Sequence, residues 1–286
     1  MIQSMTGFGK ASLQLPTKKI TVEIKSLNSK GLDVSVRMPS ALREMELTVR
    51  NNIGQKLERG KIDFSLFVEV TGEETSSKIN VPIVKAYINQ MKEVIPNGDD
   101  TEFMKMAVRM PDALKTEREE IDETEWSSIH GVIEQALENI QNFRIAEGVA
   151  LEREFLFRIA NILALMNEAV SLDGERIQNV KTRLHASIEE LKVNVDENRF
   201  EQELIYYLEK MDITEEKVRL ENHLNYFIET LAGNEANGRK LGFITQEMGR
   251  EINTMGSKAN HAKMQKLVVQ MKDELEKIKE QVLNVL

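Results

Sequence analysis

The absence of proline from residues 126–286 is the feature that most constrains how this chain folds. Proline lacks a backbone N–H and breaks helix interiors, so a proline-free stretch of this length is open to long helices. Apolar residues recur along it in steps of three and four, which is typical of helices that bury one face. The pattern predicts helices over residues 126–170, 173–193, 197–232 and 237–284. Because helices of this length often pack against copies of themselves, we expect an oligomer.

The first part of the chain shows a different pattern, in which apolar and polar residues alternate as in half-buried strands. Strands are expected over Gln3–Leu15, Lys19–Leu27, Leu32–Met38 and Lys61–Val70. A helix that opens at Pro39 and ends at Gly60, and a second over Pro82–Val94, complete a β-β-β-α-β-α order. This order favours one mainly antiparallel sheet with helices on one side.

These two patterns predict an α+β protein with two domains. Residues 1–110 form the predicted N-terminal domain, residues 111–125 an acidic linker, and residues 126–286 an all-α C-terminal domain of long helices. The GxG motif at Gly7 and Gly9 lies inside a strand and not between a strand and a helix. We therefore interpret its glycines as a bend or bulge and not as a phosphate loop.

The composition excludes several kinds of chemistry. The chain of 286 residues has no cysteine, which rules out disulfides, thiolate zinc sites and cysteine nucleophiles. Its four histidines have no partner at short spacing, so a histidine-rich metal site is not expected. A metal would have to be held by carboxylates, which indicates Mg²⁺ or Mn²⁺.

We expect no secretory signal in the opening residues and no membrane helix. The opening residues, MIQSMTGFGK, lack the basic region and apolar run of a secretory signal. The longest nearly apolar run, Ile159–Met166, is much shorter than the ~20 residues that a membrane helix needs. We therefore expect a cytoplasmic protein with no membrane partner.

The charge is unevenly distributed along the chain. The net charge of −9 argues against general affinity for nucleic acid, because phosphate contacts need positive charge. Residues Asn237–Lys266 nonetheless hold six bases and two acids, so this segment carries +4 and the remainder −13. A basic patch on an acidic body favours binding of a polyanion at that one site.

The segment Gly238–Asn260, GRKLGFITQEMGREINTMGSKAN, is the densest in functional groups. Its apolar residues form one helical stripe, made by Leu241, Ile244, Met248, Ile252 and Met255. One polar line beside it carries Arg239, Gln246, Arg250, Asn253 and Ser257, and a second carries Lys240, Glu247, Glu251, Thr254 and Lys258. Amides and hydroxyls mixed with charges favour a functional face. The alternative is a salt-bridged surface helix in which Gly249 and Gly256 are packing or kink positions.

A second constellation lies in the third predicted helix. Asp212, Glu216, Arg219 and His223 are separated by four, three and four residues, so they share one helical face. Carboxylates, a guanidinium and an imidazole there could bind a divalent ion, hold a phosphate and move a proton. The alternatives are a capping box of Asp212 with Glu215, a surface pair of Glu216 with Arg219, and a packed His223.

Glu247 and Glu251 are four residues apart, so both carboxylates point the same way from one helix. With an acid from another helix, such as Glu203 or Glu216, they could ligate a hard cation. A nearby base such as Arg250 would complete a phosphodiester site, in which a metal activates water and cations stabilise the charge on phosphate oxygens.

Several of these segments resemble the YicC/YloC family of bacterial endoribonucleases. The resemblance is carried by MIQSMTGFG, ERGKIDF, NRFEQEL, MDITEEKVRLENHL, GRKLGFITQEMGREINTMGSKAN and KIKEQVLNV, and it spans nearly the whole chain. It implies a YicC-like N-terminal domain followed by a C-terminal helical domain. It also implies a metal-dependent endonuclease that cuts single-stranded or structured RNA, including small regulatory RNAs, and that assembles as a hexamer.

The resemblance assigns functional positions residue by residue. The matching positions are Glu201, Glu203, Asp212, Glu215, Glu216, Arg219, His223, Arg239, Gln246, Glu247, Arg250, Glu251, Asn253, Ser257 and Lys258. Gly242 departs from the family pattern, because many members have an acid there, so either that acid is dispensable or a neighbour such as Glu247 serves. Ser29 and Lys30 stand where many members have a histidine and an arginine, which argues against a mechanism that uses an N-terminal histidine.

The leading hypothesis is an oligomeric endoribonuclease that acts in RNA turnover. Its metal, Mn²⁺ or Mg²⁺, would be held by Glu247, Glu251, Asp212, Glu216 and Glu203. Its substrate would be bound by Arg239, Lys240, Gln246, Asn253, Ser257, Lys258 and Arg219. Catalysis would fall to Glu247, Glu251, Arg250 and His223, with His223 as the proton donor. The expected partners are RNA, further copies of the chain in a homohexamer, and other RNA-decay factors. The competing hypotheses are a non-enzymatic RNA-binding scaffold and a structural coiled-coil assembly.

Overall fold

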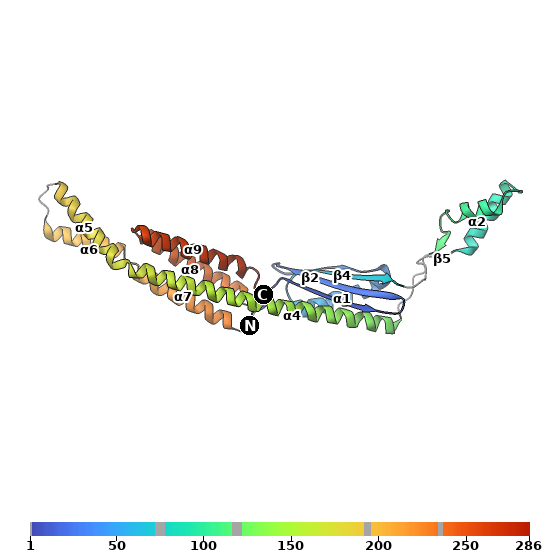
Figure 1. Cartoon of the computed structure of the whole chain (residues 1–286), viewed down its shortest axis with the longest axis horizontal. Coiled ribbons are helices and arrows are strands. Elements are labelled where there is room, and N and C mark those ends of the chain that lie inside the picture. Colours follow the sequence, from blue (N-terminus) through green and yellow to red (C-terminus); the bar gives the residue numbers. More distant parts are fainter. Residues whose placement is uncertain (1, 72–77, 116–121, 192–195, 234–236) are drawn as a thin grey trace.

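The computed structural model shows an elongated α+β molecule, which confirms the predicted fold class (Figure 1). It describes residues 2–71, 78–115, 122–191, 196–233 and 237–286. Residues 116–121 of the predicted acidic linker and residues 192–193 of the predicted helix over 173–193 lie outside the described residues.

A four-stranded sheet forms the N-terminal part of the molecule. Its strands lie in the order β1 (Gly7–Gln14), β2 (Lys18–Leu27), β4 (Gly60–Val70) and β3 (Leu32–Arg37). The pairs β1–β2 and β2–β4 are antiparallel, whereas β3 and β4 run parallel. The sheet is therefore mainly antiparallel, as predicted. Its alternating residues, including Ile20, Val22, Ile24, Ile62 and Phe64, are fully buried on one face.

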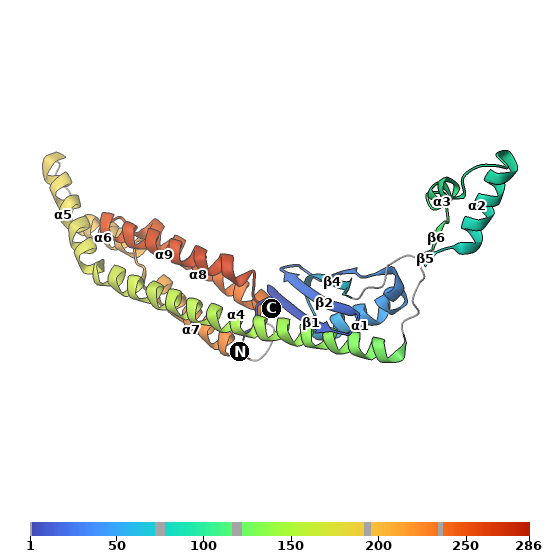
Figure 2. The ribbon, with the colours of Figure 1, turned by 45° about the vertical axis from the view of Figure 1, so that its right-hand side comes forward.

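Two helices cover this buried face. The first is α1 (Glu46–Leu57), which follows a short 3-10 helix, η1 (Ser40–Met45). The second is the first half of α4 (Glu123–Ser171), which runs along the sheet (Figure 2). Ile53 from α1 and Ile133 from α4 belong to the same apolar core as the strand residues.

The glycines of β1 allow α4 to approach the strand closely, and they do not mark a bend in it. At Gly9, a β-carbon would overlap the backbone carbonyl oxygen of Ala136 and lie 2.8 Å from the Cβ of Ile140. The bend or bulge interpretation is therefore wrong, because β1 pairs with β2 in unbroken register through Gly7 and Gly9. Glycine is needed at this contact so that the helix can lie directly on the strand.

A bundle of four helical segments forms the C-terminal part. The second half of α4 packs against α7 (Thr214–Ala232) and α9 (Ala262–Val282), and α8 (Gly238–Lys258) packs between α7 and α9. Its core is continuous and apolar, and within it the rings of Phe155 and Phe227 meet edge to face with their centroids 5.7 Å apart.

Two predicted long helices are each divided in two. The predicted helix over 197–232 is α6 (Glu197–Lys210) followed by α7, and the predicted helix over 237–284 is α8 followed by α9. No proline or glycine marks either break. Helix α9 begins at a capping side chain, since His261 accepts from the Met264 N–H. The N-cap of α7 is Ile213, which has no side-chain cap, and Asp212 just before it accepts from the Thr214 N–H.

Helix α4 is shared by both parts of the molecule. Its first half belongs to the sheet core and its second half to the helical core, so the predicted domain start at residue 126 lies within an element that both cores use. The chain termini meet beside it, because Met5 N–H donates to Asn284 O and Leu286 N–H donates to Gln3 O (Figure 1). By length and composition alone α4 is apolar enough to cross a membrane, but its residues Phe155 and Ile162 pack in the helical core.

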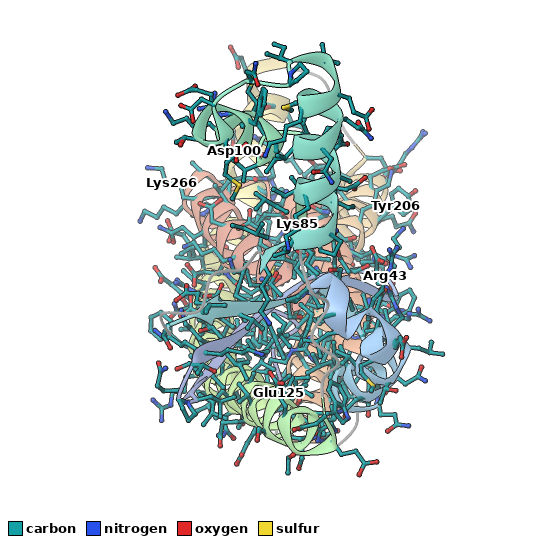
Figure 3. The ribbon with its side chains drawn as sticks, turned by 90° about the vertical axis from the view of Figure 1, so that its right-hand side faces the viewer. Arg43, Lys85, Asp100, Glu125, Tyr206 and Lys266 are labelled. Atoms are coloured by element: carbon teal, nitrogen blue, oxygen red, sulfur yellow. The ribbon has the colours of Figure 1, made fainter. Side chains whose placement is uncertain are left out.

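Two small units extend from the ends of the molecule (Figures 1 and 2). One contains α2 (Val81–Val94), α3 (Asp100–Ala107) and the short pair β5–β6 (Lys78–Ile79 and Leu114–Lys115). The expectation that the helix over 82–94 covers the sheet is wrong, since α2 packs on α3 instead. Figure 3 looks along the long axis and shows Lys85 and Asp100 on this unit, nearest the viewer. The other unit contains α5 (Asp173–Leu191) and α6.

Candidate active site on α7 and α8

The hairpin of α7 and α8 brings together the two constellations found in the sequence. The helices run antiparallel, so the C-terminal end of α8 meets the start of α7. There Lys258 Nζ donates to Glu216 Oε1 at 2.8 Å and to the backbone carbonyl of Asp212 at 2.8 Å. Lys258 thus joins the two segments within one chain.

Glu216 is a buried carboxylate, with 5% of its surface exposed. Its Oε1 accepts from Lys258, whereas its buried Oε2 has no hydrogen-bond partner in the described part of the chain. A buried acceptor without a partner costs ~1–3 kcal/mol, and more when it is charged. A ligand that offered positive charge to Oε2 would remove this cost, and a hard divalent cation is such a ligand.

Asp212 lies at the same end of the hairpin and is exposed to solvent. Its Oδ1 accepts from the hydroxyl of Thr214 at 2.7 Å and from the Thr214 N–H at 3.0 Å. These hydrogen bonds, and then the charges of Lys258 and Arg176, lower the pKa of Asp212 below its ordinary value. Asp212 is therefore a carboxylate at neutral pH. The capping box weighed for Asp212 with Glu215 is wrong, because the N-cap of α7 is Ile213 and Asp212 binds Thr214 and not Glu215.

Arg176 of α5 is a buried cation that the sequence did not single out. Only 1% of it is exposed, and its Nη1 donates to the carbonyl of Lys258 at 2.9 Å. Its Nη2 lies 2.5 Å from Asp173 Oδ1. Nothing in the spacing around Arg176 distinguishes it from a surface arginine, so only the tertiary packing of α5 reveals it. It fixes the end of α8 that carries Lys258.

Glu251 is the second buried acid, with 5% of its surface exposed. Glu251 lies seven residues, about 10 Å, before Lys258 on the same side of α8. Because α7 runs antiparallel to α8, Glu251 faces the part of α7 near His223 and not the part that carries Glu216. No hydrogen bond or ion pair of its carboxylate is found among the described residues. Its predicted companion Glu247 is exposed and lies 3.9 Å from Arg250.

The five predicted metal ligands do not converge in one chain. Within the described ranges, no three histidine, aspartate or glutamate side chains are close enough to hold one metal ion together. Glu216 and Glu251 are buried on facing helices, Asp212 and Glu247 are exposed beside them, and Glu203 is exposed on α6. The hairpin therefore offers two separate buried carboxylates and not a complete ligand set.

The remaining residues of the α7 constellation lie at or near the surface. Arg219 pairs with Glu215 one turn before it. The alternative of a surface pair between Glu216 and Arg219 is therefore wrong, because Glu216 binds Lys258 and is buried. His223 is half-buried and makes no side-chain hydrogen bond within the described chain.

The first polar line of α8 is solvent-exposed along its whole length, as its spacing indicates. It consists of Arg239, Gln246, Arg250, Asn253 and Ser257. The second line is divided, because Glu251 is buried, Lys258 is half-buried, and Lys240 and Glu247 are exposed. Lys240 Nζ lies 4.8 Å from the ring centroid of Tyr226 on α7. The exposed line has two guanidiniums and two amides and no acid.

The glycines of α8 divide into packed and free positions. A β-carbon at Gly256 would lie 2.9 Å from Val268 Cγ1, and one at Gly249 would lie 3.3 Å from Leu275 Cδ2, so both glycines admit α9 at close range. Gly242 is different, since a β-carbon there would meet only Val282, at 3.9 Å. The position where the family pattern has an acid therefore has room for a side chain.

A mainly antiparallel sheet, covered by helices on one face and joined by the shared helix α4 to a helical bundle with two buried acids, defines an α+β protein. Comparison with known proteins places it more closely: the chain belongs to the YicC-like endoribonuclease family. Residues 2–153 match the model described as "Endoribonuclease YicC-like, N-terminal region", and residues 170–286 match "Endoribonuclease YicC-like, C-terminal".

Two relatives are similar over their full lengths and over all of this chain. The chain is 33% identical over 293 residues to a probable endoribonuclease YicC of Clostridioides difficile. It is 28% identical over 288 residues to a probable endoribonuclease YicC of Haemophilus influenzae. The resemblance carried by the sequence motifs is thus confirmed, and the end of the first matched region at residue 153 falls inside α4.

Proposed function

We propose that this protein is an endoribonuclease that cuts RNA phosphodiester bonds on the α7–α8 surface with the help of Mn²⁺ or Mg²⁺. The observation that carries the proposal is the buried Glu216, whose Oε2 has no partner among the described residues although Lys258 holds its other oxygen. The names of the two relatives support the reaction, and the basic exposed line of α8 supports RNA as the substrate.

The acids of the hairpin fit a hard divalent cation by their chemistry. Glu216 offers Oε2, Glu251 offers a buried carboxylate, and Asp212 and Glu247 lie beside them. Bound there, the cation would lower the pKa of a water molecule and stabilise negative charge on the phosphate. Because one chain places no three of these acids together, we propose that the ligand set is completed by the substrate phosphate or by a neighbouring copy in a homohexamer.

The other side chains have roles that follow from their exposure. Arg239, Lys240 and Arg250 are exposed cations that bind phosphates along α8. Lys258 is held by Glu216 and the Asp212 carbonyl, so its role is to orient the acid more than to grip the RNA. Four exposed side chains along the same surface donate or accept hydrogen bonds to sugar and base atoms. They are Gln246, Asn253, Ser257 and Arg219. His223, half-buried near Glu251, is the proposed proton donor to the leaving oxygen.

A cleavage assay with matched variants tests this proposal. We expect purified protein to shorten end-labelled RNA in the presence of Mn²⁺ or Mg²⁺ and to stop when a chelator is added. Glu216→Gln and Glu251→Gln should each lower the rate at least tenfold, whereas Glu229→Gln, at an exposed position of α7, should leave it unchanged. Undiminished cleavage by the Glu216→Gln, Glu251→Gln double variant would refute the site.

The nature of the product ends distinguishes two routes. Attack by metal-activated water leaves no cyclic phosphate and acts on DNA as well, whereas attack by the RNA 2′-hydroxyl leaves a 2′,3′-cyclic phosphate and excludes DNA. Mapping the ends of the labelled products assigns the route.

A non-enzymatic RNA-binding scaffold is the second candidate function. The observation in its favour is the lack of three convergent acids within the described chain. It predicts that labelled RNA is shifted on a gel in a salt-dependent manner but is never shortened.

A further inference from the structure

Phe243 is the most exposed aromatic side chain on α8, with 60% of its surface open to solvent. It lies four residues after Arg239, three before Gln246 and seven before Arg250, so it belongs to the same exposed line of the helix. The predicted functional face therefore contains an aromatic ring between its two guanidiniums. The polar spacing along α8 does not predict a role for Phe243, because a phenylalanine is ordinarily assigned to the core.

A second aromatic ring lies next to this line. Tyr226 of α7 is 45% exposed, and the ammonium of Lys240 lies 4.8 Å from its ring centroid. Lys240 is three residues before Phe243, one turn of the same helix. Two exposed rings and a cation thus occupy adjacent positions across the α7–α8 surface.

The neighbours of Phe243 indicate what covers it. The line around Phe243 consists of guanidiniums, amides and a hydroxyl, and no other large hydrophobic residue among the described residues of α8 is exposed. Aromatic faces interleaved with cations are the arrangement that binds single-stranded nucleic acid, because bases stack on the rings while the cations hold the backbone. A duplex offers no free base face to such a ring.

We propose that Phe243, with Tyr226 on the neighbouring helix, forms a stacking platform for an unpaired base of the RNA. This inference rests on the proposed function and adds to it the residue that holds the unpaired base. Phe243 lies eight residues, about 12 Å, from Glu251 along α8, so the stacked base flanks the bond that is cut. Phe243 is thus a specificity residue outside the reacting atoms.

Binding measured without cleavage tests the platform directly. Fluorescence anisotropy with a labelled uridine oligonucleotide, in the presence of chelator, should show that Phe243→Ala weakens binding about tenfold. That factor corresponds to ~1.4 kcal/mol and lies within the range for one base–aromatic stack. Phe243→Trp should retain the affinity, and Phe67→Ala, which removes an exposed ring from β4, should leave it unchanged. A fully paired duplex of equal length should bind all four proteins equally.

A scan of abasic oligonucleotides locates the stacked base. One abasic position should weaken binding to the unchanged protein as much as Phe243→Ala does, and the two changes together should weaken it no further. Equal affinities of Phe243→Ala and the unchanged protein for the uridine oligonucleotide would overturn the platform. So would a change in oligomer mass on Phe243→Ala in sedimentation, since the ring would then be a protein contact.

The two proposals fail in different ways. RNA that is bound through Phe243 but never shortened with metal would refute the endoribonuclease and leave the stacking platform in place. RNA that is cut equally well by Phe243→Ala, with unchanged preference for unpaired over paired substrates, would refute the platform and leave the endoribonuclease in place.

Discussion

Replacing Lys258 by methionine tests the buried contact on which the candidate site depends. The substitution keeps most of the aliphatic stem and removes the ammonium that binds Glu216 Oε1 and the Asp212 carbonyl, both at 2.8 Å. Glu216 would then be a buried carboxylate with no cation on either oxygen. Removal of one partner from a fully buried ion pair costs ~3–5 kcal/mol.

The expected magnitude is smaller than for a fully buried pair, because the side chains of Lys258 and Glu216 are 26% and 6% exposed. We therefore expect Lys258→Met to lower the free energy of unfolding by about 2–3 kcal/mol at neutral pH. Adding Glu216→Gln to Lys258→Met should recover at least half of this loss, because no uncompensated charge then remains.

Urea denaturation followed by circular dichroism measures these differences. Lys266→Met, at an exposed position of α9, is the matched control and should change the free energy of unfolding by less than ~0.5 kcal/mol. The reasoning is refuted if Lys258→Met behaves like this control, or if the double variant is as unstable as the sum of its single substitutions.

Four further substitutions test the fold. Gly9→Ala should destabilise the protein by about 1–3 kcal/mol, because the new methyl group overlaps the Ala136 carbonyl oxygen. Gly242→Ala should stabilise the protein by up to ~1 kcal/mol, because that helical position has room for a methyl group. Thermal unfolding of the two variants measures both effects. Arg144→Met should cost about 2–3 kcal/mol in a denaturant titration, since the buried guanidinium donates to three backbone carbonyls of the sheet core. Burial alone would raise the pKa of Glu274, but hydrogen bonds from three neighbouring side chains lower this pKa to about 2. The stabilisation from Glu274 should therefore be complete above pH ~4.5 and be lost as the pH falls towards 2, and Glu274→Gln should remove this part of the pH dependence of unfolding.

Much of the fold followed from local patterns. Alternation in β2 and β4 is a direct result of one buried sheet face, so these strands were predicted to within a residue. The position of α2 was not predicted, because no local sequence pattern shows that this helix packs on α3 and not on the sheet. The breaks between α6 and α7 and between α8 and α9 were missed because no proline marks them: α9 begins at the side-chain cap of His261, and α7 begins at Ile213 without a side-chain cap.

Only those features of the candidate site that depend on spacing within one helix were predictable. Helical spacing places Asp212 and Glu216 on one face, but the partner of Glu216 depends on the antiparallel register of α7 and α8, which sequence spacing does not contain. For the same reason, spacing alone left open a pair of Arg219 with Glu216, whereas Arg219 pairs with Glu215. Arg176 was missed altogether, since its role depends on where α5 leaves the end of α4.

The burial of Glu216 and Glu251 supports the proposed functional role of the α7–α8 hairpin. Replacing buried charges by apolar residues of similar volume is often neutral or stabilising, so a hairpin selected only for packing has no need of an acid at either position. Both acids are buried, and one oxygen of Glu216 is left without a partner in the described chain. The exposed line of α8 has the complementary property, because its cations and amides make few contacts within the chain and remain open to a ligand. Acids held at a cost to stability beside a free basic face are what cation-assisted chemistry on a phosphodiester requires, and a coiled-coil assembly accounts for neither.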